Sequence, residues 1–113
     1  MEKFVLVIDK EKFIRSLFET ALKDSKIKVM ALESILDNYY LIDDLKPAIL
    51  FFDIHSTMGE YQKILNYHQQ TKLIAMGFPE DFDLLKGIDD KLAMKLEKPI
   101  SAQKFKNFVE ELV

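Results

Sequence analysis

Apolar residues along this chain follow two different periods. Five short runs rich in apolar residues are typical of β-strands, and three of them, 4–8, 48–52 and 73–76, contain no polar residue at all. Such continuous runs predict strands that are buried on both faces, as in a parallel sheet. Residues 27–32 and 92–96 are each interrupted by a lysine, so we expect them to form edge strands.

Between these runs, apolar residues recur at the spacing of a helix. The stripes predict helices over residues 12–24, 32–39, 61–68 and 105–112, and Pro79 followed by two acids predicts a short helix that Gly87 ends. Thr57, with Glu60 three residues later, fits a capping box before the third helix. Ser101 is the expected N-cap of the last helix.

Strict alternation of strands and helices predicts an α/β fold. We expect a flavodoxin-like, doubly wound, five-stranded parallel sheet in the order 2-1-3-4-5, within a three-layer α/β/α sandwich. The 113 residues are the length of one domain, so the expected division is a single domain over 1–113. Ligand sites in such sheets lie at the carboxyl ends of the strands, where the strand order switches.

Composition narrows the function classes. Hydrophobic residues make up 49% and charged residues 31%, which is typical of a folded globular protein. The net charge of −3 argues against a nucleic-acid binder, and the absence of cysteine excludes disulfides and cysteine-based zinc sites. No apolar run has the length of a membrane helix and no signal peptide is evident, so we expect a cytoplasmic location.

Charged residues stand where three of the predicted strands end. Asp9 follows the first strand, Asp53 follows the third, and Lys98 follows the last. In the order 2-1-3-4-5 these side chains meet at one rim of the sheet. Two carboxylates and a lysine there indicate a site for a divalent metal and a phosphoryl group.

The segments 4–9 and 47–53, together with Lys98-Pro99, resemble the landmarks of response-regulator receiver domains (the CheY-like family) over the whole chain. The resemblance implies that Asp53 is the phosphoacceptor and that Lys98 contacts the phosphoryl group. It also implies that Asp9 helps to hold magnesium. In this chemistry, positioned charge neutralises oxygens whose negative charge builds up in the transition state.

The chain departs from the family pattern at several positions. Lys10 stands where a second acid is usual, and Glu11 comes one place late, so we expect magnesium to bind weakly through Asp9, Asp53 and Glu11. Gly77 offers no hydroxyl after the fourth strand, and Lys95 replaces an aromatic switch residue. These departures predict an atypical receiver, or pseudo-receiver, in which phosphorylation of Asp53 is doubtful.

Several residues near the predicted rim have two open interpretations. Lys10 either forms a standing ion pair with Asp53 or extends into solvent. Ser56 and Thr57 are candidates to replace the absent hydroxyl. His55 is either a proton or metal partner of the site or, as we expect, a residue of a solvent-facing loop, and His68 is expected at the edge of the core. Phe78 either caps the site or, as we expect, packs under the fourth helix.

The predicted function is that of a stand-alone atypical receiver in two-component, phosphorelay signalling. It is not expected to be an enzyme, and its expected partners are a histidine kinase or a downstream signalling protein. A monomer or weak homodimer is expected. The family's partner surface is a basic face here, formed by Lys86, Lys91, Lys95, Lys104 and Lys106. A working phosphoacceptor and a small ligand-binding α/β domain are the alternatives.

Overall fold

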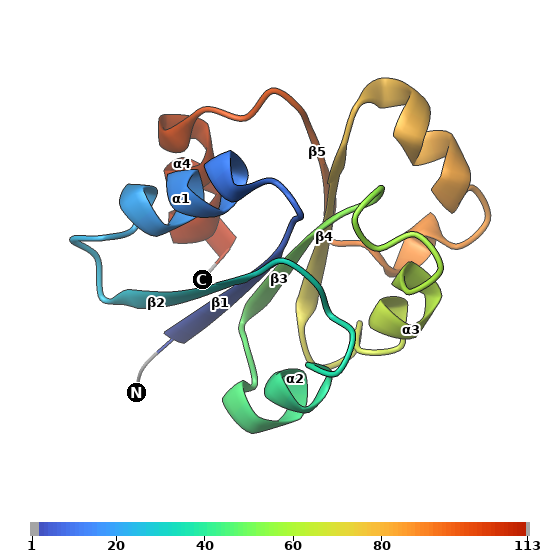
Figure 1. Ribbon diagram of the computed structural model, residues 1–113, viewed down its shortest axis with the longest axis horizontal. Coiled ribbons are helices and arrows are strands. Elements are labelled where there is room, and N and C mark those ends of the chain that lie inside the picture. The colour runs from blue at the N-terminus through green and yellow to red at the C-terminus, as the bar shows by residue number, and fades with distance from the viewer. Residues whose placement is uncertain (1–2, 113) are drawn as a thin grey trace.

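A five-stranded parallel sheet forms the centre of the computed structural model, which describes residues 3–112 (Figure 1). Its spatial order is β2-β1-β3-β4-β5, with every neighbouring pair parallel. This confirms the predicted order and the two predicted edge strands. The strands are β1 (Lys3–Ile8), β2 (Ile27–Leu32), β3 (Ile49–Asp53), β4 (Lys72–Gly77) and β5 (Met94–Glu97).

Helices cover both faces of the sheet. Figure 1 shows α1 and α4 against one face and α2 and α3 against the other, so the three-layer sandwich is confirmed. The α-helices are α1 (Lys12–Ala21), α2 (Tyr40–Leu45), α3 (Tyr61–Leu65) and α4 (Ala102–Leu112). Two short 3₁₀ helices, η1 (Pro79–Leu85) and η2 (Asp89–Lys91), connect β4 to β5. No helix within residues 3–112 is long and apolar enough to cross a membrane.

The sheet divides the apolar interior into two layers. Successive side chains of a strand point to opposite faces, so Val5 and Val7 pack beneath α1 and α4 while Leu6 and Ile8 pack on the other side. β3 is buried at every position. This burial on both faces explains why the central runs lack polar alternation.

The predicted helix over residues 32–39 is wrong. Leu32 ends β2, and α2 begins only at Tyr40. Asp37 has a φ of 64°, in the left-handed region that a helix excludes. The side-chain amide of Asn38 donates to the carbonyl oxygens of Ser34 and Leu36, which stabilises a loop instead.

Two other predicted helices end early. The predicted helix 12–24 ends at Ala21, where the following amides bond three residues back, Lys23 to Thr20 and Ser25 to Leu22. The predicted helix 61–68 ends at Leu65 and continues only as turns. His68 is therefore exposed, which contradicts its expected place at the core edge.

The capping predictions had mixed outcomes. The Ser101 hydroxyl accepts a hydrogen bond from the amide of Lys104 at 3.1 Å, so its role as N-cap is confirmed. The predicted capping box is wrong, because the N-cap of α3 is Glu60 and the Thr57 hydroxyl donates to the carbonyl oxygen of Asp53 at 2.8 Å. Phe78, which was expected to pack inside, is 48% exposed.

Candidate functional site

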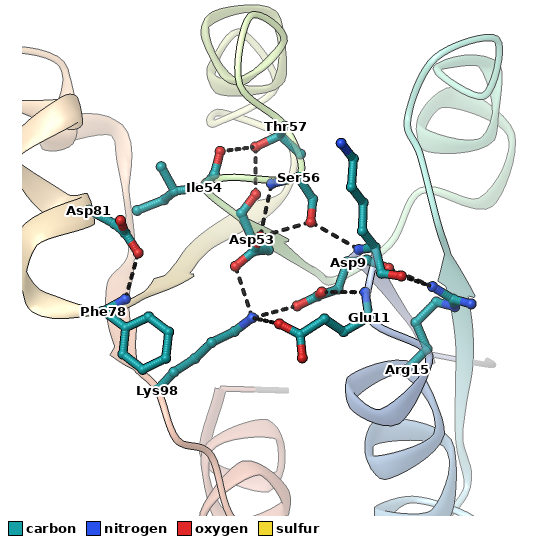
Figure 2. Close-up of polar contacts among 11 residues, drawn as sticks. Asp9, Glu11, Arg15, Asp53, Ile54, Ser56, Thr57, Phe78, Asp81 and Lys98 are labelled. Carbon is teal, nitrogen blue, oxygen red and sulfur yellow. Dashed lines mark hydrogen bonds and ion pairs between the residues drawn. The ribbon is translucent and has the colours of Figure 1, made fainter.

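The side chains of Asp9, Asp53 and Lys98 meet at one rim of the sheet (Figure 2). The Nζ atom of Lys98 lies 2.9 Å from Oδ2 of Asp9 and 2.9 Å from Oδ1 of Asp53. All three side chains are buried. The structure thus brings together the three residues that the strand ends predicted.

Strand register produces this convergence. Ile8 of β1 pairs with Phe52 of β3, so Asp9 and Asp53 follow paired residues on neighbouring strands. The amide of Lys98 donates to the carbonyl oxygen of Gly77 at 2.8 Å, which fixes the chain after β5 to the end of β4. Since the carboxyl ends of parallel strands share one edge, residues far apart in sequence become neighbours.

Both carboxylate oxygens of Asp53 are occupied. Oδ1 faces the ammonium group of Lys98, while Oδ2 accepts hydrogen bonds from the amide and the hydroxyl of Ser56, both at 2.8 Å. Asp53 is only 6% exposed. Charge-assisted hydrogen bonds of this kind hold the carboxylate in one orientation.

Ser56 also connects the two loops that carry the acids. Its Oγ atom accepts a hydrogen bond from the amide of Lys10 at 2.9 Å, in addition to donating to Asp53. The loop after β1 and the loop after β3 are therefore joined through one hydroxyl. Ser56, proposed as a substitute for the absent hydroxyl, does lie against Asp53, but from the loop rather than from β4.

Asp9 is held from its own loop. Its Oδ1 atom accepts the amide of Glu11 at 2.9 Å, and the guanidinium of Arg15 donates to the carbonyl oxygens of Asp9 and Lys10, both at 2.9 Å (Figure 2). This loop is therefore anchored to α1. The role of Arg15 left no sign in the periodic pattern, because its side chain bonds main-chain atoms.

Burial and charge act in opposite directions on this cluster. Burial raises the pKa of Asp9, and the neighbouring Asp53 charge adds to this effect against the hydrogen bonds from Glu11 and Lys98. Burial alone would lower the pKa of Lys98, but its hydrogen bonds to Asp53 and Asp9 outweigh burial and raise that pKa. Lys98 is therefore a protonated partner of both carboxylates at neutral pH.

The expected alternatives for Lys10 are now distinguished. Among residues 3–112, Lys10 forms no ion pair with Asp53, and its side chain is exposed, so the standing pair with Lys10 is wrong. Lys98 already occupies that position. Glu11 is the next nearest acid, with Oε1 3.8 Å from Lys98 Nζ and a side chain that is 65% exposed.

Asp81 is a site residue that sequence reasoning missed. It is buried at the start of η1, where its Oδ2 accepts the amide of Phe78 at 2.8 Å and its Oδ1 lies 2.6 Å from His55 Nε2. His55 has 62% of its side chain exposed, as expected of a loop histidine, yet it has this partner.

Gly77 leaves the space that Asp81 fills. A Cβ atom at Gly77 would lie 3.0 Å from both Cβ and Oδ2 of Asp81 and 3.3 Å from Cδ1 of Ile54. The position that would carry a hydroxyl in the family pattern is thus bordered by a carboxylate. The sequence signal is an acid two residues after Pro79, which the pattern by itself predicts only as a charge at a helix terminus.

The residues present do not fit a magnesium ion in this arrangement. Magnesium requires several oxygen ligands in near-octahedral geometry, and the predicted set was Asp9, Asp53 and Glu11. The Lys98 ammonium instead lies between the two aspartates, and each carboxylate also accepts main-chain amide hydrogen bonds. Within residues 3–112 no three acidic or histidine side chains form a group that could hold a metal.

One lysine of the predicted basic face has an acidic partner. Lys95 Nζ lies 2.7 Å from Oδ2 of Asp89, and this hydrogen bond lowers the pKa of Asp89. Lys91 belongs to η2 and lines a hollow beside α3. The role of the five lysines as a partner surface stays a prediction.

The sequence matches no protein-family model and no curated protein sequence. Its fold, in contrast, matches solved structures, several of them over nearly their full length. A response regulator from Thermotoga maritima superposes with a TM-score of 0.82 at 16% identity, over 99% of this chain and 98% of that chain. The signal receiver domain of a candidate Luxo repressor from Vibrio parahaemolyticus gives 0.82 at 22% identity, over 99% and 90%.

The chemotaxis response regulator CheY4 of Vibrio cholerae gives a TM-score of 0.76 at 10% identity, over 100% of both chains. These structures share the fold of response-regulator receiver domains, and this chain has that fold. Because these sequence identities are low, the structural matches show the fold alone. The activity of the rim must therefore be inferred from its own residues.

Proposed function

We propose that this chain is an atypical receiver-type signalling domain that acts through protein–protein contacts without phosphorylation of Asp53. The observation that carries this proposal is the occupancy of Asp53, whose oxygens bond Lys98 Nζ at 2.9 Å and Ser56 at 2.8 Å. A nucleophile held in this way must break charge-assisted bonds before it can attack phosphorus. The receiver fold supports a role in two-component signalling, and the proposal includes that the domain itself catalyses no reaction.

The Lys98 ammonium supplies the two carboxylates with the positive charge that a metal ion would otherwise supply. Its ammonium is bonded to both Asp9 and Asp53, and its pKa is raised, so the charge persists at neutral pH. A magnesium ion would have to displace this ammonium from both carboxylates. The site is therefore proposed to stay in one arrangement, and the surface that it presents to partners stays constant.

Intact-mass spectrometry tests this proposal. The protein is incubated with acetyl phosphate and Mg²⁺, beside an Asp53→Ala control, and no added phosphate is expected in either. An adduct on the wild-type chain that is absent from Asp53→Ala would contradict the proposal. Melting with and without Mg²⁺ provides a second readout, for which no change is expected.

A working phosphoacceptor is the second candidate. It is favoured by one observation: Glu11 brings a third carboxylate to 3.8 Å from Lys98, beside Asp9 and Asp53, although Lys98 would have to move from Asp53 to the incoming phosphoryl group. In that case the carboxylate of Asp53 attacks phosphorus, the bond to acetate breaks, and acetate leaves. The same mass measurement distinguishes the two candidates.

A further inference from the structure

A groove runs along α3, outside the cluster at the rim. It consists of two adjoining hollows of about 600 and about 310 Å³ that share Lys63 and Asn66. Ile88 and Lys91, from the segment around η2, line the larger hollow opposite α3. In Figure 1 this segment lies in orange beside α3.

The lining combines apolar, amide and positively charged side chains. Its apolar contacts come from Leu65, Tyr67 and Ile88, while four side-chain amides offer both donors and acceptors: Gln62, Asn66, Gln69 and Gln70. Lys63 and Lys91 supply the only charges among the lining residues. Side-chain amides can hydrogen-bond an extended main chain, and two lysines make the groove positive.

This positive charge stands out in an acidic protein. The chain has 19 acidic residues, yet none lies between Glu60 and Glu80. Neither groove lysine forms an ion pair with any residue from 3 to 112. Lys63 Nζ instead lies 4.0 Å from the centre of the Tyr39 ring.

Three acids lie next to the groove in sequence: Glu60, Asp89 and Asp90. Oε1 of Glu60 accepts a hydrogen bond from the Tyr39 hydroxyl at 2.7 Å, and Asp89 is bonded to Lys95 at 2.7 Å, whereas the side chain of Asp90 is exposed. None of these acids lines the groove, and none forms an ion pair with Lys63 or Lys91. The two lysines are therefore available to pair with carboxylates from outside the chain.

We propose that this groove binds an extended acidic segment of a partner protein. Lys63 and Lys91 would pair with its carboxylates, and the amides of Gln62 and Asn66 would bond its main chain. A nucleic acid fits less well, because two lysines on a chain of net charge −3 neutralise few phosphates. This inference rests on the proposed function only in that signalling proceeds through protein contacts.

The test is a ¹⁵N-correlated NMR titration of the full chain with two decapeptides. One alternates aspartate and alanine, and the other has asparagine in place of every aspartate. The aspartate peptide is expected to shift the side-chain amide signals of Gln62, Asn66 and Gln69, with binding that weakens as salt rises. The asparagine peptide is expected to leave them unchanged.

Two double variants locate the charge. Lys63→Gln with Lys91→Gln is expected to weaken binding about tenfold, because two exposed ion pairs are lost. The matched control, Lys12→Gln with Lys26→Gln, lies outside the groove and the predicted basic face and is expected to change binding less than about twofold. Both pairs remove the same charge from exposed or half-exposed positions, so a general loss of attraction would affect both equally.

Several results would overturn the inference. These are equal binding of both peptides, no shifts with the aspartate peptide, or an equal loss in the Lys12→Gln with Lys26→Gln control. Self-association that disappears in Lys63→Gln with Lys91→Gln would assign the groove to a second copy, and tighter binding of an RNA oligonucleotide would assign it to nucleic acid. A phosphate adduct on Asp53 would contradict the proposed function but leave the peptide result standing.

Discussion

At the scale of single residues, the rim depends on one ammonium group between two buried carboxylates. The strand ends predicted Asp9, Asp53 and Lys98, because register in a parallel sheet is set by the apolar runs that precede them. Asp81 could not be predicted in the same way, and Ser56 only as a candidate hydroxyl, since both act from segments whose course leaves no periodic pattern. Their contacts depend on loop geometry that only the folded chain defines.

Removing Lys98 should destabilise the protein far more than removing Asp9. Lys98→Met leaves Asp9 and Asp53 buried without a counter-charge, for an expected loss of about 3–5 kcal/mol in the free energy of unfolding. Asp9→Asn leaves Lys98 paired with Asp53 and should cost about 1 kcal/mol. Urea denaturation at pH 7 measures both losses, and equal losses would contradict this assignment of charges.

The contribution of Lys98 should also depend on pH with a definite sign. Its pKa is raised by pairing, so its stabilisation is present below the ordinary lysine pKa of about 10.4 and is lost as pH rises through the folded value. The difference between wild type and Lys98→Met should stay constant from about pH 7 to 10 and shrink above that. Exposed Lys104→Met is the control, and a difference that persists unchanged at higher pH would refute the pairing.

The pKa shift of Asp9 disfavours its charged form, whereas the shift of Lys98 favours the charged form. Burial raises its pKa, so its charged form is penalised at neutral pH, and that penalty is relieved as pH falls through the raised pKa. The cost of Lys98→Met should therefore shrink as pH falls through the raised pKa of Asp9, because a protonated Asp9 carboxyl no longer needs the ammonium. The same denaturation series extended to acid measures this.

Gly77→Ala should destabilise the chain by about 1–3 kcal/mol through overpacking. The added methyl carbon would lie 3.0 Å from the Cβ atom of Asp81 and 3.0 Å from its carboxylate oxygen Oδ2. In an Asp81→Ala background the oxygen is gone, so Gly77→Ala should cost less. A double-mutant cycle in urea measures this coupling, and strictly additive losses would show that Asp81 does not restrict position 77.

At the scale of elements, the strands were predicted more accurately than the helices. Buried runs define strands directly, and β2 has its predicted bounds, Ile27–Leu32. The incorrectly predicted helix over residues 32–39 shows why an apparent helical period can mislead. Ile35 is buried from a loop, so apolar residues from a strand end, a loop and a helix start imitate one helical stripe.

The layer between β3, α1 and α4 is held by three aromatic rings. The centroid of the Phe18 ring lies 3.9 Å from that of Phe105 and 5.5 Å from that of Phe51. Phe18→Ala should therefore cost about 3–5 kcal/mol. Phe13→Ala is the matched control, on the same helix but 73% exposed, and should cost less than about 0.5 kcal/mol. Comparable losses in urea denaturation would contradict the packing.

At the scale of the whole molecule, the receiver fold was predictable from the sequence, because alternation of strands and helices allows few topologies. The behaviour of the rim was not, because Lys98, rather than Lys10, pairs with Asp53. A constant rim would leave any signal to pass through surfaces such as the groove along α3.

The ion cluster of Lys98 with Asp9 and Asp53 is tested most directly by the ¹⁵N signal of the Lys98 side-chain ammonium at pH 7. A buried ammonium bonded to Asp9 and Asp53 exchanges its protons slowly, so a protected signal is expected that weakens in Asp53→Asn. It should persist unchanged when Mg²⁺ is added. A Lys98 signal that exchanges as fast as that of exposed Lys104, or that vanishes with Mg²⁺, would contradict the standing ion cluster.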